Sequence, residues 1–288
     1  MTAAVPTRPS GFLAALLRNR KFVAGAGIFL LIAVVALVGS LTVDPRLRGA
    51  GRFPPRQPPG TAAILGTDTL GRSIAVQMTQ AVPNSLQVGL IAALIGTLLG
   101  AAIGFISGYF SGIVDALLRI LIDVFLSVPS LLFLILIAAL VRGVGVRTMA
   151  LIIGIFAWPS PARQVRAQIL SLKERPFVEV ARLSGMSGIE IVFRELAPHM
   201  LQWLGANFVN AFIAAILAES GLSILGLGPQ REMTLGMLIY WALNYGAVLQ
   251  NLWWWWGTPV VTLILLFLSL YLIHIGLDEV SNPRLQGR

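Results

Sequence analysis

The 288-residue sequence contains no cysteine, two histidines and few charged residues. The lack of cysteine excludes disulfides, thiolate nucleophiles and cysteine-based metal sites. His199 and His274 lie 75 positions apart, so a histidine-based metal or catalytic site has little support. Neither lysine follows the glycine spacing of a phosphate-binding loop. We therefore expect no catalytic residue, no metal site and no cofactor within this chain.

Charge is scarce, whereas hydrophobic residues are abundant. Charged residues make up 11% of the chain and hydrophobic ones 57%, and an ordinary soluble domain carries about 25% charged residues. The net charge is +9, but the basic residues sit at the edges of apolar runs. They form no basic stripe with interleaved aromatics, which argues against a nucleic-acid partner. The composition predicts a membrane protein whose main surroundings are the lipid bilayer.

Long stretches without Asp, Glu, Lys or Arg mark the candidate membrane spans, because a bilayer core of about 30 Å needs roughly 20 apolar helical residues. These stretches are 22–43, 73–114, 124–141, 148–162, 196–218 and 233–277. They predict an all-α, polytopic membrane protein with six transmembrane helices. The first helix is 22–43, and a five-helix core follows at 86–276.

Two of the longer stretches contain breaks. Pro83-Asn84-Ser85 predicts a helix start, so we expect a span at 86–108 that is preceded by an interfacial segment. The four tryptophans 253–256 resemble an aromatic belt at the headgroup level, and the Gly-Thr-Pro that follows predicts the start of a last span, 257–276. The remaining stretch, 234–250, is expected to form an interfacial or re-entrant helix.

The lysines and arginines orient the chain. With the N-terminus inside, 13 of the 21 fall on the cytoplasmic side, as the positive-inside rule requires. The expected parts are then a cytoplasmic tail (1–21), an extracytoplasmic loop (44–85), a cytoplasmic loop within the core (163–197) and a second cytoplasmic tail (277–288). The proline-rich loop 44–85 is expected to be an extended surface segment rather than a folded domain.

Small residues mark one helix as a packing helix. Glycines recur every four residues at Gly96, Gly100, Gly104, Gly108 and Gly112. Such spacing lets helix backbones approach closely in a membrane, where lipid supplies no hydrophobic drive. The pattern predicts a packing seam and leaves open whether its partner lies in this chain or in a second subunit.

Polar residues inside the apolar stretches are candidates for function. Asp115, Arg119 and Asp123 are spaced at i, i+4 and i+8, so we expect them to pair with one another near the cytoplasmic boundary. Glu219 is expected to close the fifth span at its outer end. The structural interpretation of these charges, as boundary ion pairs and caps, is favoured over a proton or ion relay.

Two asparagines in the fifth span are the best candidates for groups that face a solute pathway. Asn207 and Asn210 would leave their amides unsatisfied if they faced lipid. Hydrogen bonds between helices are an equally good explanation of the pair.

The segment 174–198 predicts a helix, a glycine turn and a second helix. Pro176 suits the first turn of a short helix at 177–184, and Gly185 suits its left-handed C-terminal cap. Ser187 and Glu190 have the spacing of a capping box at the start of the next helix. A short helix on a rigid stem is typical of a peg that docks into a groove of a soluble partner. The alternative is a solvated amphipathic connector.

The spacing within this segment is similar to a known family. Glu179-Val180-Ala181, Gly185 and Pro198 resemble the EAA loop of ABC importer permeases. Further stretches resemble one branch, the C-type permease subunit of the dipeptide, oligopeptide and nickel importers. These stretches are Leu65-Gly66-Thr67-Asp68-Thr69-Leu70-Gly71-Arg72, the Asp115/Arg119/Asp123/Pro129 pattern, and Glu219 with Leu222-Ser223 and Leu225-Gly226-Leu227-Gly228.

The chain departs from that branch at several positions. Val180 stands where the branch usually has Ala, and Glu195-Leu196-Ala197-Pro198 replaces its His-x-Leu-Pro. Ser73 replaces an Asp of the branch, and Leu235 stands where its Trp-Gly pair usually begins. Asn282 replaces the Asp of its Asp-Pro-Arg. These differences bear on partner contacts and substrate more than on architecture.

The resemblance implies the fold of a type I ABC importer permease in the cell inner membrane, with both termini cytoplasmic. It implies that a coupling helix inserts into a nucleotide-binding subunit through Phe177, Glu179, Ala181, Arg182 and Gly185. The implied partners are a homologous B-type permease, two ATP-binding subunits that carry ATP and Mg, and an extracytoplasmic binding protein that delivers short peptides. Nickel or another small solute is the alternative cargo, and an ion-coupled secondary transporter that uses Asp123 or Glu219 is the alternative class.

Overall fold

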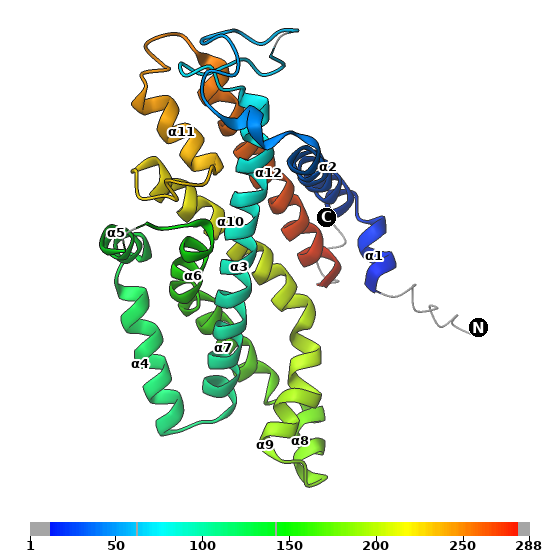
Figure 1. Ribbon diagram of the computed structural model, residues 1–288. Helices are drawn as coiled ribbons and strands as arrows, with labels where there is room; N and C mark the ends of the chain where they lie inside the picture. Colours follow the sequence, from blue (N-terminus) through cyan, green and yellow to red (C-terminus); the bar gives the residue numbers. More distant parts are fainter. Residues whose placement is uncertain (1–11, 62, 142, 282–288) are drawn as a thin grey trace, which may run out of the picture.

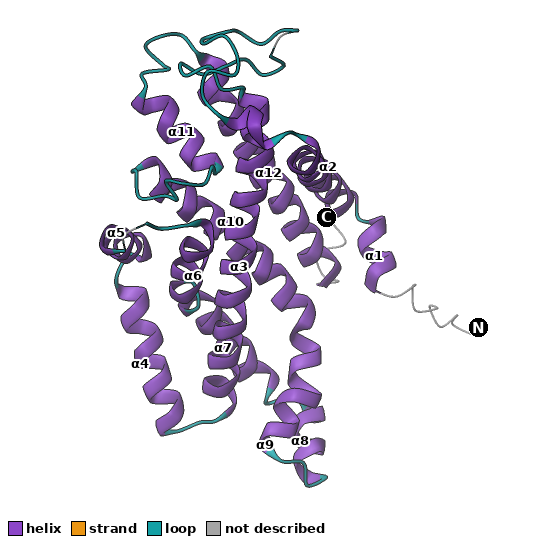
Figure 2. Ribbon diagram, in the orientation of Figure 1, coloured by secondary structure: helices purple, strands orange, loops and turns teal. Residues whose placement is uncertain are grey.

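Helices fill the apolar stretches, because a chain in lipid must satisfy its backbone hydrogen bonds internally. The computed structural model describes residues 12–61, 63–141 and 143–281, and within these ranges it contains helices and no strand (Figures 1 and 2). The departure at Asn282 and the outer parts of both expected tails, 1–11 and 282–288, lie outside the described residues. The elements are α1 (Phe12–Arg18), α2 (Arg20–Thr42), η1 (Pro45–Arg48), α3 (Ile74–Tyr109), α4 (Ile113–Ser127), α5 (Ser130–Leu140), α6 (Val146–Phe156), α7 (Pro159–Leu172), α8 (Pro176–Leu183), α9 (Gly188–Glu190), η2 (Ile191–Leu196), α10 (Ala197–Ile224), α11 (Leu235–Asn244) and α12 (Trp253–Ser281).

The expected count of six spans is not confirmed. Four helical runs of the described chain are long and apolar enough to cross a membrane: α2, α3, the continuous run Gly188–Ile224 and α12. A fifth forms if α4 and α5, which meet at a 77° bend, are taken as one broken span. The weak stretch at 148–162 divides between α6 and α7, because Pro159 starts a new helix there.

The predicted break at Pro83 is wrong. Helix α3 runs without interruption from Ile74 to Tyr109 and contains Pro83 in its interior. The two polar residues that follow do not cap a helix. The Asn84 amide donates to the carbonyl of Met233 at 2.8 Å, and the Ser85 hydroxyl accepts from the amide of Leu235 at 3.0 Å. Asn84 and Ser85 therefore bind the start of α11 and the residues before it, instead of capping a new helix as their spacing predicted.

The predicted start of the last span is also wrong. Helix α12 begins at Trp253 and includes Pro259. Trp253 is largely exposed, whereas Trp254 and Trp255 are buried. The indole of Trp254 donates to the carbonyl of Thr67 at 3.0 Å. These rings thus belong to a core that joins α12 to the loop before α3, rather than to an aromatic belt.

The loop between η1 and α3 is more ordered than the expected extended segment. Its two halves are joined by backbone bonds from Gly51 to Leu70 at 2.8 Å and from Phe53 to Gly71 at 3.0 Å. Asp68 is fully buried and accepts from the amides of Leu70 and Arg72, each at 2.8 Å. The loop is therefore held by hydrogen bonds despite its prolines.

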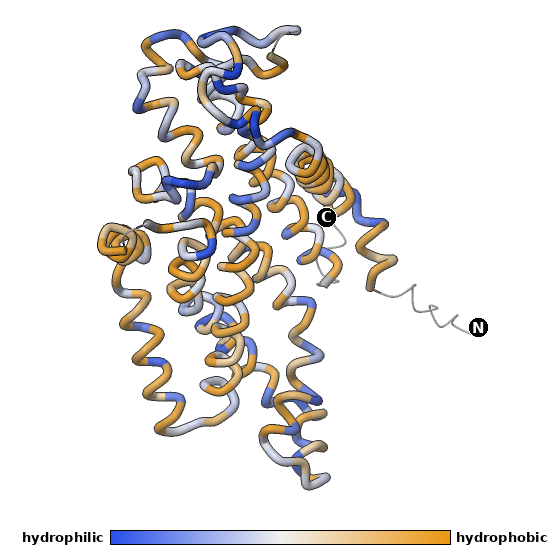
Figure 3. Tube along the Cα trace, viewed as in Figure 1, coloured by the Kyte–Doolittle hydropathy of each residue, from blue (hydrophilic) through white to orange (hydrophobic). Residues whose placement is uncertain are grey.

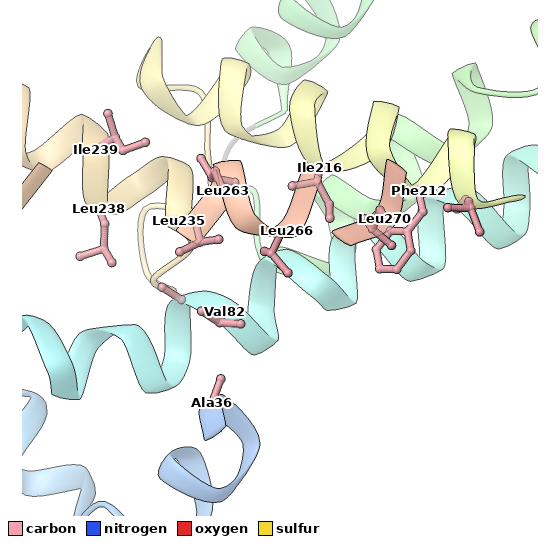
Figure 4. Packing of buried hydrophobic residues seen from close by; sticks show 13 residues of the cluster. Ala36, Val82, Phe212, Ile216, Leu235, Leu238, Ile239, Leu263, Leu266 and Leu270 are labelled. Atoms are coloured by element: carbon pink, nitrogen blue, oxygen red, sulfur yellow. The ribbon is translucent and has the colours of Figure 1, made fainter. Parts of the chain in front are cut away.

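Helix α3 lies at the centre of the bundle, between α2 and α12 on one side and α6, α7 and α10 on the other (Figure 1). The main core joins α10, α11 and α12 over α3, with Val82, Phe212, Ile216, Leu235 and Leu266 in contact (Figure 4). Hydrophobic residues also cover the outside of the long helices (Figure 3). The bundle thus has apolar residues on both sides of its helices, as expected of a protein in lipid.

Candidate functional site

Helix α8 projects at one end of the bundle, next to α9 (Figure 1). Pro176 occupies its first position, and Gly185 follows it with φ of +82°. The amide of Gly185 donates to Arg182 at 3.0 Å and that of Met186 to Ala181 at 3.2 Å, which closes the helix end. The predicted short helix and its glycine cap are confirmed, with the helix one residue earlier at each end.

The predicted capping box is confirmed as well. The Ser187 hydroxyl accepts from the amide of Glu190 at 3.3 Å, and the Glu190 carboxylate accepts from the amide of Ser187 at 3.1 Å. The next turn, η2, is π-helical, and the amide of Ala197 donates to Val192. We attribute the wide turn to Pro198, whose ring would clash with the carbonyl four residues earlier. The elements α9, η2 and α10 thus form one continuous helical run, Gly188–Ile224.

The inner face of α8 holds it against the bundle. Val178 and Ala181 are buried, and the Phe177 ring stacks on His199 with centroids 4.7 Å apart. The guanidinium of Arg182 lies 5.7 Å from the centre of the Tyr109 ring. Phe177, Ala181 and Arg182 therefore anchor the helix.

The outer face of α8 points away from the bundle. Glu179 and Gly185 are exposed, as are Val180 at 62% and Leu183 at 83%. A rigid helix that exposes large apolar side chains beside charges at its free end is suited to a protein partner.

A cavity of about 310 Å³ lies between the α4–α5 bend, the α6–α7 break and α10. Both Asn207 and Asn210 line it, so the structure places the two asparagines together on one wall. The Asn207 amide is largely buried and donates to the carbonyl of Trp203 at 3.2 Å, whereas Asn210 is exposed. The other polar side chains of the wall are Ser130, Ser160 and Gln164, and no charged residue is among those that line the cavity.

The predicted pairing among Asp115, Arg119 and Asp123 is wrong, because both carboxylates pair with α7 instead. The Asp115 carboxylate accepts two bonds from Arg166 in α7, at 2.6 and 2.7 Å, and one from Ser107 at 2.7 Å. Asp123 pairs with Arg163 at 3.1 Å. Hydrogen bonding to Asp115 raises the pKa of Arg166, so this guanidinium stays charged. Arg163 and Arg166 are three residues apart and share one face of α7, and this spacing is the sequence signal for the two pairs.

The prediction that Glu219 closes the outer end of a span is wrong. It lies in α10 before the last turn and is fully buried. Its carboxylate accepts from the hydroxyls of Ser223 at 2.7 Å and Ser85 at 3.2 Å. Because Ser85 also accepts from Leu235, Glu219 links α10, α3 and the start of α11.

The glycines of α3 lie against α7 and against Ala157, which stands between α6 and α7. Cβ atoms added at Gly100, Gly104 and Gly108 would come within 2.6 to 2.8 Å of Pro161, Val165 and Ile169, and one at Gly96 within 2.7 Å of Ala157. Gly112 lies beyond the end of α3, and a Cβ added there would meet nothing within 4 Å. The seam therefore sets the position of α7, which carries one wall of the cavity.

Comparison with known proteins places this geometry in a family. Residues 100–287 match the family described as binding-protein-dependent transport system inner membrane component. A chain of a solved MetNI methionine ABC transporter matches with a TM-score of 0.54 and 20% identity, over 70% of this chain and 93% of that one. This likeness shows a shared type I ABC importer permease fold.

Curated relatives agree with the family match. A peptide transport system permease protein, described as putative, from Brucella abortus is 31% identical over 94% of this chain and 90% of its own length. The oligopeptide permease OppC of Mycobacterium tuberculosis is 32% identical over 77% of each chain. The dipeptide permease DppC of Bacillus subtilis is 29% identical over 93% of this chain and 83% of its own.

Helix α8, the glycine-packed α7 and the cavity thus occur in a chain whose sequence matches permeases along most of its length. Among the described residues no cluster of His, Asp or Glu has the geometry to hold a metal ion. The chain belongs to the family of binding-protein-dependent transport inner-membrane components, the membrane subunits of ABC importers.

Proposed function

We propose that this chain is one of two homologous permease subunits in an ATP-driven importer of short peptides. Its family works with a partner ATPase and a substrate-binding protein, as the family description implies. The relatives described above are peptide permeases by name, which favours peptides over nickel or another small solute. The full complex would contain a B-type permease, two ATPase subunits with ATP and Mg, and an extracytoplasmic binding protein.

In this proposal α8 is the contact with an ATPase subunit, and the end of the bundle that carries it faces the cytoplasm together with both termini. The exposed Glu179, Val180 and Leu183 would enter a groove of the ATPase. Phe177 and Ala181 would transmit the motion because they are packed against the bundle. ATP-driven closure of the ATPase pair would then rock the permease between outward- and inward-open states.

The cavity is proposed as this subunit's half of the peptide pathway. The observation that carries the proposal is continuity: α8 is joined by three residues to α7, and by the turn 184–187 to the continuous helical run Gly188–Ile224 that contains α10. Both α7 and α10 line the cavity. Amide and hydroxyl groups on a neutral wall match the backbone amides of a peptide of any sequence. Asn207 would exchange its present bond to Trp203 for one to the cargo, and the exposed Asn210 would bind the cargo beside it.

The test uses the complete transporter in proteoliposomes with its binding protein and a labelled peptide. We expect Glu179→Lys and Gly185→Pro to abolish transport and the stimulation of ATP hydrolysis by loaded binding protein. Proline cannot adopt the positive φ of position 185. The matched control is Gly205→Ala, since a Cβ there meets nothing within 4 Å. Wild-type coupling in both variants would eliminate α8 as the coupling helix.

A further inference from the structure

Helices α4 and α7 run antiparallel, and they and the residues that flank them are joined by a ladder of contacts. Nearest α8, the Lys173 ammonium donates to the hydroxyl of Ser111 at 3.0 Å. The next rungs are Arg166 to Asp115 and Arg163 to Asp123. The last rung before the cavity is a ring contact between Trp158 and Phe125, with centroids 5.2 Å apart. The ladder therefore runs from the stem of α8 to the cavity wall.

The strongest rung is the pair between Arg166 and Asp115. Its two parallel bonds are the fork geometry in which an arginine holds a carboxylate most firmly. Both side chains are only about one-fifth exposed, so solvent screens this pair less than a surface ion pair. The pair Arg163–Asp123 is more exposed, and we expect it to contribute less.

Helix α4 depends on this ladder for its position. It packs on α3 and α7, and it buries Ile122 against Trp158 and Ala162. Its opposite face is exposed and apolar at Ile113, Leu117, Ile120 and Val124. Beyond Phe125, the chain bends by 77° into α5 and lines the cavity with Val128 and Pro129. The part of the cavity wall at the end of α4, called here the α4 wall, is therefore expected to move with α7.

We infer that the α4–α7 ladder couples motion of the docking helix to the α4 wall of the cavity, with Asp115 and Arg166 as its main positioning residues. This inference rests on the proposed role of α8. When α8 moves, α7 moves with it, and the ladder carries α4 in the same direction. Without the ladder, ATP hydrolysis would displace one wall of the cavity and leave the other behind.

The experiment reads cavity motion directly and needs no cargo. The chain has no native cysteine, so Asn210→Cys places a single reporter in this subunit within the cavity. In the complete reconstituted transporter, with the other subunits free of cysteine, the labelling rate by a water-soluble maleimide is measured in the nucleotide-free and ATP/vanadate-trapped states. The ratio of the two rates is the nucleotide response of the cavity.

Asp115→Asn and Arg166→Gln are expected to lower this response by about 2- to 30-fold, the range found for substitutions along a coupling element. The double exchange Asp115→Arg with Arg166→Asp is expected to restore most of it, because the two helices regain an ion pair with the charges reversed. The matched control is Lys21→Gln, because Lys21 pairs with Glu279 between helices remote from the cavity. It should leave the response unchanged.

The outcomes separate this inference from the proposed function. If Gly185→Pro abolishes the response while Asp115→Asn and Arg166→Gln keep it, the ladder is not the coupling element. An exchange variant no better than the single variants would overturn the inference too. If Gly185→Pro itself keeps the full response, α8 is not the input, and the proposed function of that helix fails first.

Discussion

At the scale of single residues, the carboxylate of Glu219 is fully buried inside the bundle. It receives hydroxyl bonds from two helices, and one of its donors also holds the first turn of α11. A polar group inside a bundle is costly unless all of its partners are in place. Glu219 is therefore better explained as a structural link than as the ion relay of a secondary transporter.

We expect Glu219→Leu to destabilise the assembled transporter by about 1–3 kcal/mol or more, because the hydroxyls of Ser85 and Ser223 lose their acceptor. Glu219→Gln keeps the size and one acceptor oxygen, so it should cost clearly less. Thermal unfolding of the detergent-solubilised complex measures both. Equal melting temperatures for the wild type and the Leu variant would show that the link is unimportant.

At the scale of helices, the close approach of α3 and α7 explains the glycine repeat. At Gly104 an added Cβ would lie 2.6 Å from the Val165 Cβ and 2.8 Å from the carbonyl of Ala162, which is closer than such atoms approach. Backbone atoms on the other side of the contact have little freedom to move. The two helices would have to separate to accept any side chain.

Gly104→Ala is accordingly expected to lower stability by about 1–3 kcal/mol, as overpacking does elsewhere, and to reduce transport because α7 shifts. Gly27→Ala in α2 is the matched control, since a Cβ there meets nothing within 4 Å. Melting temperature and transport rate are measured on the same preparations. A Gly104 variant that matches Gly27→Ala in both would contradict the packing described for this seam.

At the scale of the whole molecule, α8 projects at one end of the bundle and a cavity lies farther along it, and the chain belongs to a family driven by a partner ATPase. Uptake by the complete complex should therefore require ATP inside the vesicle. It should persist when an uncoupler removes the proton gradient, and the purified chain alone should accumulate nothing. Flux that collapses with the uncoupler while ATP remains present would support the secondary-transporter alternative instead.

Local features were predictable because neighbouring residues decide them. The turn at Gly185 and the capping box of Ser187 and Glu190 depend on residues within one helical turn, so spacing alone located them. The apolar stretches likewise predicted an all-helical membrane protein, since backbone satisfaction in lipid leaves few alternatives. The motifs from Leu65 to Gly228 sufficed for the family resemblance.

Contacts between distant segments could not be read from spacing. Pro83 stays inside α3, and Asn84 and Ser85 bind a segment about 150 positions away instead of capping a helix start. Asp115 and Asp123 pair with α7 rather than with Arg119, because the glycine seam brings α7 close to α3 and leaves α4 beside it. Helix periodicity reports which residues share a face, whereas packing selects the helix opposite that face.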